Sequence, residues 1–166
     1  MKKKGLPEIL GDIRLTIYRI DAFASRISNR IKTLEDLSLY NIGRFNYLSK
    51  EYYKEIEINK NILSNLLKIK TLLEILEIRL ETLILIGSLT QYIYPVVKAL
   101  EDIRGSLGNS IEFGPLIDDI LANLYPIIIT SEPQVVIKEN EDERKILEEA
   151  EKIASEELKE KYKVPA

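Results

Sequence analysis

The stretch LGDIRLTIYRIDAFASRISNRIKTL, residues 10–34, decides the architecture that we expect for this chain of 166 residues. Apolar side chains recur along it at alternating intervals of three and four residues. That spacing puts them on one face of a helix and is typical of the seam of a coiled coil or a helical hairpin. We therefore predict a first helix over about residues 8–40, followed by a turn at Asn41 and Gly43.

A second apolar stripe begins after this turn, at Phe45 and Leu48, and becomes regular from Ile62 onward. Nothing breaks a helix before Gly87, so we expect one helix of about 45 residues, roughly 65–70 Å long at 1.5 Å per residue. A globule of this chain length has a diameter of only about 40 Å, so the pattern predicts an elongated antiparallel hairpin over about residues 8–92. Its expected seam consists of Ile13, Ile17, Ile20, Ile27, Ile31, Leu34, Leu66, Ile69, Leu73, Leu76, Leu80 and Leu83.

Shorter helices are expected after the hairpin, at about residues 94–106 and 115–124. The fold class that we predict is thus all-α, an elongated helical hairpin with shorter C-terminal helices packed along it. The predicted parts are a helical core over 1–125, a linker with extended pieces over 126–140, and an acidic C-terminal regulatory helix and tail over 141–166.

The chain contains no Cys, no His and no Trp. This composition excludes a disulfide framework, a thiolate nucleophile, an imidazole base and the usual zinc ligands. The acidic pair Asp118 and Asp119 and the acidic run at 141–143 lack the spacing of a calcium loop and are typical of a solvated surface. We therefore predict that the protein is not an enzyme, and that it has no cofactor and no catalytic or metal site.

Charge divides the chain into two parts. Residues 1–70 carry a formal charge of +6 and residues 71–166 carry −9, which together give the net charge of −3. The basic part suggests an anionic partner such as a membrane surface or a nucleic acid, and the acidic part suggests a segment that folds back on it. The alternative is a surface that is simply rich in charge.

The first helix carries the candidate membrane-binding residues. Arg19, Phe23, Arg26 and Arg30 share a helical stripe that lies off the isoleucine seam. Their alternative role is to pair with acidic residues of the closing helices. The complete candidate surface consists of Lys2, Lys3, Lys4, Arg14, Arg19, Phe23, Arg26 and Arg30, with Leu6, Ile9 and Leu10 as a shallow apolar anchor.

Three glycines near the junctions of the later helices, Gly87, Gly105 and Gly108, are hinge candidates. A hinge there would let neighbouring helices straighten into one rod, and long hairpins can then pack side by side into an open array. The alternative is that these glycines only cap helices.

Four segments of the chain, taken together, resemble one family. They are IRLTIYRIDAFASRISNRI (13–31), LLKIKTLLEILEIRLETLILIGSL (66–89), YPVVKALEDIRGSL (94–107) and EAEKIASEELKEKY (149–162). This pattern resembles the archaeal ESCRT-III-like cell-division proteins of the CdvB family. The chain looks like a short paralogue without the winged-helix module of longer members, which favours co-assembly with a longer one.

The resemblance implies a filament-forming protein that remodels or constricts membranes in archaeal cell division or vesicle budding. Its implied partners are copies of itself, paralogous ESCRT-III-like subunits, an anionic membrane surface and a CdvC-type AAA ATPase that disassembles the polymer. The implied location is cytoplasmic, peripheral on the inner face of the cell membrane at the division site. We expect neither a nucleic acid nor a small-molecule substrate as partner.

The closing helix has two candidate roles, because its apolar face can either mask the hairpin or bind the ATPase. The residues in question are Leu147, Ala154, Leu158, Val164 and Pro165. A rival interpretation of the whole chain is a non-enzymatic coiled-coil adaptor or scaffold without membrane activity. Composition and periodicity are compatible with both functions.

Overall fold

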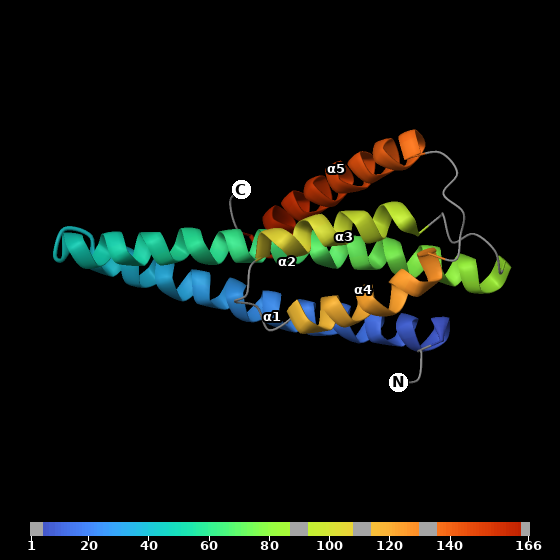
Figure 1. Ribbon diagram of the computed structural model, residues 1–166. Coiled ribbons are helices and arrows are strands. Elements are labelled where there is room, and N and C mark those ends of the chain that lie inside the picture. The colour runs from blue at the N-terminus through green and yellow to red at the C-terminus, as the bar shows by residue number, and fades with distance from the viewer. Residues whose placement is uncertain (1–4, 87–92, 108–113, 130–135, 164–166) are drawn as a thin grey trace.

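Two long antiparallel helices, α1 (Leu6–Asn41) and α2 (Asn46–Ile86), form the axis of the molecule (Figure 1). The structure is a computed structural model that describes residues 5–86, 93–107, 114–129 and 136–163. Within these ranges all regular structure is helical, which confirms the predicted all-α hairpin.

Three shorter helices cover one half of this hairpin. Helix α3 (Tyr94–Leu107) packs along α2, and α4 (Gly114–Ile129) packs against α1 and α3. Helix α5 (Val136–Glu160) packs against α2 and α3. The opposite half, which includes the turn between α1 and α2, projects beyond them as a narrow rod (Figure 1).

The core lies where the shorter helices meet the hairpin. Helix α1 buries the isoleucines of its stripe because these face α2, and its start is favoured by Pro7 in the first turn and by the acidic Glu8. Of the seam residues named above, Ile17 is half-buried against the core and all the others are buried.

The beginning of α2 differs from the expected stripe. Phe45 and Leu48 are exposed, at 58% and 40%, and the buried stripe of α2 begins at Ile56. The stripe expected to begin at Phe45 and Leu48 is therefore exposed at its start, whereas the expected seam from Leu66 to Leu83 is buried. Two helices bury only the side chains between them, and none of the described shorter helices reaches this end of the rod.

Helix also replaces much of the expected linker over 126–140. Helix α4 continues to Ile129 and contains Pro126, and α5 already begins at Val136. The extended pieces expected there are therefore absent from the described residues, and 130–135 lie outside these. A proline inside a helix removes one backbone hydrogen bond and crowds the carbonyl four residues before it, yet α4 continues for three residues beyond Pro126.

Candidate functional site

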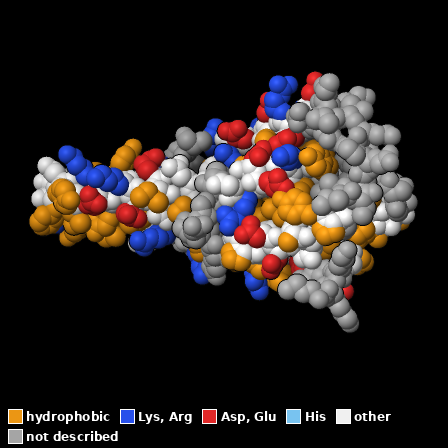
Figure 2. All heavy atoms as spheres, viewed as in Figure 1, with side chains coloured by type: hydrophobic (Ala, Val, Ile, Leu, Met, Phe, Trp, Pro, Cys, Tyr) orange, Lys and Arg blue, Asp and Glu red, His pale blue; other side chains and the backbone are white. Residues whose placement is uncertain are grey.

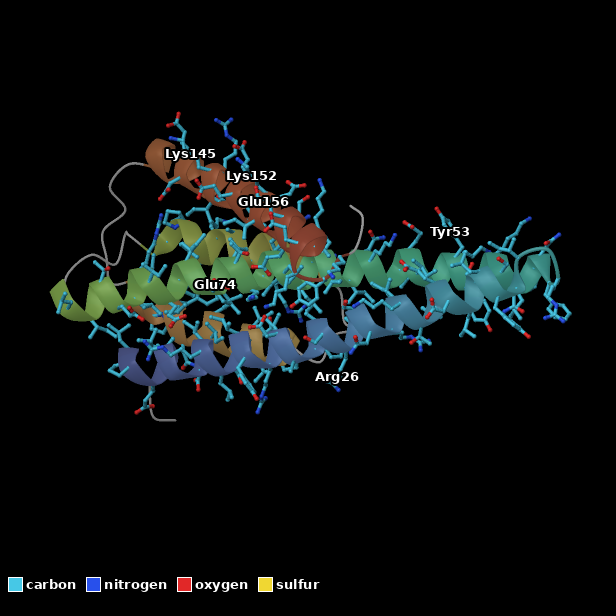
Figure 3. The ribbon with its side chains drawn as sticks, turned by 180° about the vertical axis from the view of Figure 1, so that it is seen from behind. Arg26, Tyr53, Glu74, Lys145, Lys152 and Glu156 are labelled. Carbon is cyan, nitrogen blue, oxygen red and sulfur yellow. The ribbon has the colours of Figure 1, made fainter. Side chains whose placement is uncertain are left out.

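A row of three arginines lies on the outer side of α1, and we call Arg19, Arg26 and Arg30 the α1 cationic face. All three are exposed, and no salt bridge within the described part of the chain engages any of them. The guanidinium of Arg26 lies 5.1 Å from the centroid of the Phe23 ring, and Figure 3 shows Arg26 extending away from the hairpin. These cations are therefore available to an anionic partner.

The other residues expected on the membrane-binding surface have different places. Arg14 bridges to α2, with its Nε 2.9 Å from Glu77 and its Nη2 2.7 Å from Glu81, so its charge is already compensated. Phe23 is half-buried against the core. Lys2, Lys3 and Lys4 lie outside the described residues.

The expectation that Leu6, Ile9 and Leu10 form an apolar membrane anchor at the start of α1 is wrong. Ile9 and Leu10 are buried, at 0% and 6% exposure, and Leu6 packs partly against the same core. Helix α4 lies along α1 and contributes to the same core, so these side chains support the fold instead of a surface.

Helix α5 places its apolar face on the hairpin half that the shorter helices cover. Ala154 and Leu158 are buried and Leu147 is half-buried, while Val164 and Pro165 lie outside the described residues. A partner that binds the apolar face of α5 can do so only after α5 has moved away from α2 and α3.

Ion pairs fasten α5 to α2. The closing helix therefore neutralises cations of α2, whereas the sequence suggested that it pairs with Arg19, Arg26 and Arg30. Among the described residues, the one ion pair that reaches α1 from this end of the chain joins Lys161 to Asp21 at 3.9 Å. The pairs between α5 and α2 are Asp142–Arg79 (3.2 Å), Glu151–Lys68 (4.0 Å) and Glu157–Lys70 (3.5 Å).

Lys70 is the centre of this attachment, and we call Lys70, Asp21, Glu74 and Glu157 the Lys70 cluster. Its ammonium group lies 2.8 Å from Asp21 of α1, 3.8 Å from Glu74 of α2 and 3.5 Å from Glu157 of α5, and Lys70 is only 7% exposed. Burial lowers the pKa of Lys70, but contact with Asp21 and the charges of the other carboxylates outweigh it, so the pKa is raised. The charged ammonium therefore joins three helices.

Near the N-terminal end of α5, the carboxyl group of Glu143 lies close to that of Asp102. Burial and the neighbouring carboxyl of Asp102 on α3 raise the pKa of Glu143 to about 7, and Lys98 opposes this effect. Glu101 adds to the repulsion. This contact between α5 and α3 is therefore sensitive to pH near neutrality.

The end of the rod carries a surface that the sequence reasoning missed. We call residues 37–50 the hairpin tip. Five of the 12 aromatic residues of the chain lie between positions 40 and 53, and this clustering was the available signal. The exposed apolar side chains of the tip are Leu37, Leu39, Tyr40, Ile42, Phe45, Tyr47 and Leu48.

The candidate hinge glycines, metal sites and membrane-spanning segments provide no further functional site among the described residues. Gly105 lies inside α3, and an added Cβ there would meet no atom within 4 Å, whereas Gly87 and Gly108 lie outside the described residues. In the part of the chain that the structure describes, no set of acidic side chains is arranged to hold a metal ion. No described helix combines the length and the apolarity needed to cross a bilayer.

Comparison with known proteins shows that the chain is similar to a cell-division protein over nearly its full length. The chain is 48% identical to cell division protein B3 of Sulfolobus acidocaldarius over 169 aligned residues, which cover 99% of this chain and 99% of that protein. No family model matches the chain. No solved structure matches it either.

Proposed function

The chain belongs to the CdvB family of cell-division proteins, as its sequence segments predicted, and from this premise we propose that it is a filament-forming protein that remodels or constricts membranes. The setting would be cell division or vesicle budding, with an ESCRT-III type of assembly. The observation that carries the proposal is the near-complete alignment with cell division protein B3 at 48% identity.

The α1 cationic face supports the membrane part of this proposal. Each cation near an anionic lipid surface contributes about 1 kcal/mol, so three arginines would give weak, reversible and salt-sensitive adsorption. Because Arg19, Arg26 and Arg30 are exposed and engage no salt bridge among the described residues, adsorption would break no ion pair of these residues.

The attachment of α5 supports regulated assembly. Removal of α5 would uncover apolar residues of α2 and α3, and an exposed apolar surface of that kind can pack against a second copy. The charged contacts at Arg79, Lys68 and Lys70 are suited to such a reversible closure, because ion pairs exchange readily with water or with other charges.

The proposed partners follow from the same movement. Copies of this chain and paralogous subunits would use the uncovered surface, and a CdvC-type AAA ATPase would bind the released α5 through Leu147, Ala154 and Leu158. Disassembly by the ATPase would then return the chain to the closed form.

Co-sedimentation with lipid vesicles tests the membrane part. We expect the full chain to pellet with vesicles of phosphatidylglycerol at low salt and to remain in the supernatant with phosphatidylcholine. The triple variant Arg19→Gln, Arg26→Gln, Arg30→Gln should lose most of this binding. The matched control replaces three exposed lysines of α5, Lys145, Lys152 and Lys159, by Gln and should bind as the unchanged protein does.

Electron microscopy tests the assembly part. The variant Asp142→Lys, Glu151→Lys places like charges opposite Arg79 and Lys68, so it should loosen α5 and form filaments at a lower concentration than the unchanged chain. Monomers under all conditions, together with no vesicle binding, would favour the coiled-coil adaptor instead.

A further inference from the structure

The hairpin tip is the most apolar exposed region of the described chain. Seven of the 16 exposed large hydrophobic residues among those described lie between positions 37 and 48. Tyr47 is 78% exposed, Leu39 and Tyr40 are each 68% exposed, and Figure 2 shows hydrophobic side chains gathered at the narrow end of the molecule. Tyr53, just behind the tip on α2, also extends away from the rod (Figure 3).

Several polar groups of the turn form hydrogen bonds within the turn. The backbone N–H of Ile42 donates to Ser38 (3.1 Å), and those of Arg44 and Phe45 donate to the carbonyl of Asn41 (3.1 and 3.0 Å). The Asn41 side chain is buried and donates to the carbonyl of Leu37 at 2.7 Å. A turn that keeps its hydrogen bonds can enter a medium poor in water without leaving these donors unpaired.

The charge of the tip has one sign. Residues 37–50 contain Arg44 and Lys50 and no acidic residue. The Arg44 guanidinium lies 5.3 Å from the centroid of the Tyr40 ring, so a cation and an aromatic ring are presented together. Tyrosine and cationic side chains on an apolar surface are the combination enriched where proteins meet the headgroup layer of a membrane.

From these observations we propose that the hairpin tip inserts into the headgroup region of an anionic lipid bilayer. Apolar side chains on such interfacial segments enter the boundary between headgroups and acyl chains by roughly 5–10 Å, and the exposed side chains of the tip are suited to that depth. The long side chains of Arg44 and Lys50 can extend from the tip to the lipid phosphates. The inference rests on the proposed membrane association and assigns the apolar part of it to the tip.

The tip and the α1 cationic face make separate contributions. Arg30 is about 20 Å from Gly43 along α1, so a rod lying along the bilayer brings both surfaces against it. Attraction by Arg19, Arg26 and Arg30 is weakened by salt, whereas insertion of Ile42 and Phe45 is not.

A single tryptophan reports on the tip directly, because the chain contains no Trp of its own. We expect the emission of Phe45→Trp to shift to shorter wavelength with vesicles of equal parts phosphatidylglycerol and phosphatidylcholine, and to be quenched by lipids brominated in the acyl chains. Tyr18→Trp, at a 73% exposed site of α1, is the matched control and should show neither effect.

The outcomes are distinct. If the protein pellets with vesicles while Phe45→Trp is unaffected, the inference about the tip is overturned and the proposed function stands. If the protein does not pellet with any vesicle, both are overturned. If Phe45→Trp shifts with protein concentration and is insensitive to lipid, the tip binds a second copy of the chain and the inference is likewise overturned.

A pair of double variants measures the contribution of the tip. Ile42→Ser, Phe45→Ser removes side chains that are 60% and 58% exposed and should weaken partition into the vesicles by about tenfold. The control Ile78→Ser, Leu85→Ser removes apolar side chains that are 62% and 86% exposed at the opposite end of α2 and should change partition by less than about twofold. Equal losses in the two double variants would contradict a special role of the tip.

Discussion

The covered half and the tip of the hairpin are built from the same two helices, yet they have opposite surfaces. Leu76 of α2 is 0% exposed beneath the shorter helices, whereas Leu39 of α1, close to the turn, is 68% exposed. A pair of helices buries one stripe of each partner, and its other faces stay in water unless further helices pack on them. Helices α3, α4 and α5 therefore determine which half of the rod becomes core.

The largest test of this comparison replaces a leucine by alanine in each half. Leu76→Ala should lower the free energy of unfolding by about 2–5 kcal/mol, because it removes buried contacts and leaves a cavity. Leu39→Ala should change it by less than about 0.5 kcal/mol, because the side chain already lies in water. Urea unfolding followed by circular dichroism measures both variants, and similar effects in the two halves would refute the distinction.

Lysine replacement tests whether charges also differ between the halves. Lys70→Gln leaves the carboxylates of Asp21, Glu74 and Glu157 without their shared cation and should destabilise the fold by about 1–3 kcal/mol. Lys54→Gln removes an exposed pair with Glu51 (3.4 Å) near the tip and should have an effect below about 0.5 kcal/mol. Thermal unfolding of the two variants gives the comparison, and proteolysis should show α5 released in Lys70→Gln alone.

Alanine should change the stability of the two halves in opposite directions when it replaces Gly43 in the tip and Gly105 in α3. Gly43 in the tip has φ of +80°, so Gly43→Ala should destabilise the turn by about 1–2 kcal/mol. Gly105 is helical and has space for a Cβ, so Gly105→Ala should stabilise α3 by up to about 1 kcal/mol. If Gly105 is a hinge, the same variant should also alter filament formation, which electron microscopy detects.

The smallest expected effect is a pH dependence confined to the covered half. The raised pKa of Glu143, about 7, means that its protonated form is favoured in the folded chain, so this contact is most stable below the ordinary glutamate pKa. Its contribution should decrease as the pH rises from about 5 to 8, where two carboxylates face each other. The protection factors of α5 amides, which correct hydrogen exchange for its intrinsic pH dependence, should decrease over this interval, and Glu143→Gln should remove that decrease.

Much of the fold was readable from periodicity. The isoleucine stripe of α1 and the leucines of α2 predicted a hairpin, and helices at 94–107 and 114–129 begin where the sequence placed them. Periodicity was less informative at the ends: the stripe expected to begin at Phe45 is exposed there, and the helix expected to end near residue 124 continues to Ile129. Neither feature was predictable from a single sequence, because a local pattern does not show which segment of the chain lies on top of it.

The candidate sites divide in the same way. Sequence spacing correctly placed Arg19, Arg26 and Arg30 on one outer face of α1, because helical geometry alone fixes that relation. It did not show that Arg14 is held by Glu77 and Glu81, since residues more than 60 positions apart come together only through the packing of α1 on α2.

The sequence by itself determined that this chain forms long amphipathic helices, that it lacks the side chains of most catalytic sites, and that its two parts carry opposite charge. Composition and helical spacing are local properties, so no tertiary contact is needed to establish them. Only the tertiary structure decided that α5 masks cations of α2 and that the Lys70 cluster fastens it there. The tertiary structure also leaves the apolar side chains of the tip exposed, because burial depends on which helices pack against one another.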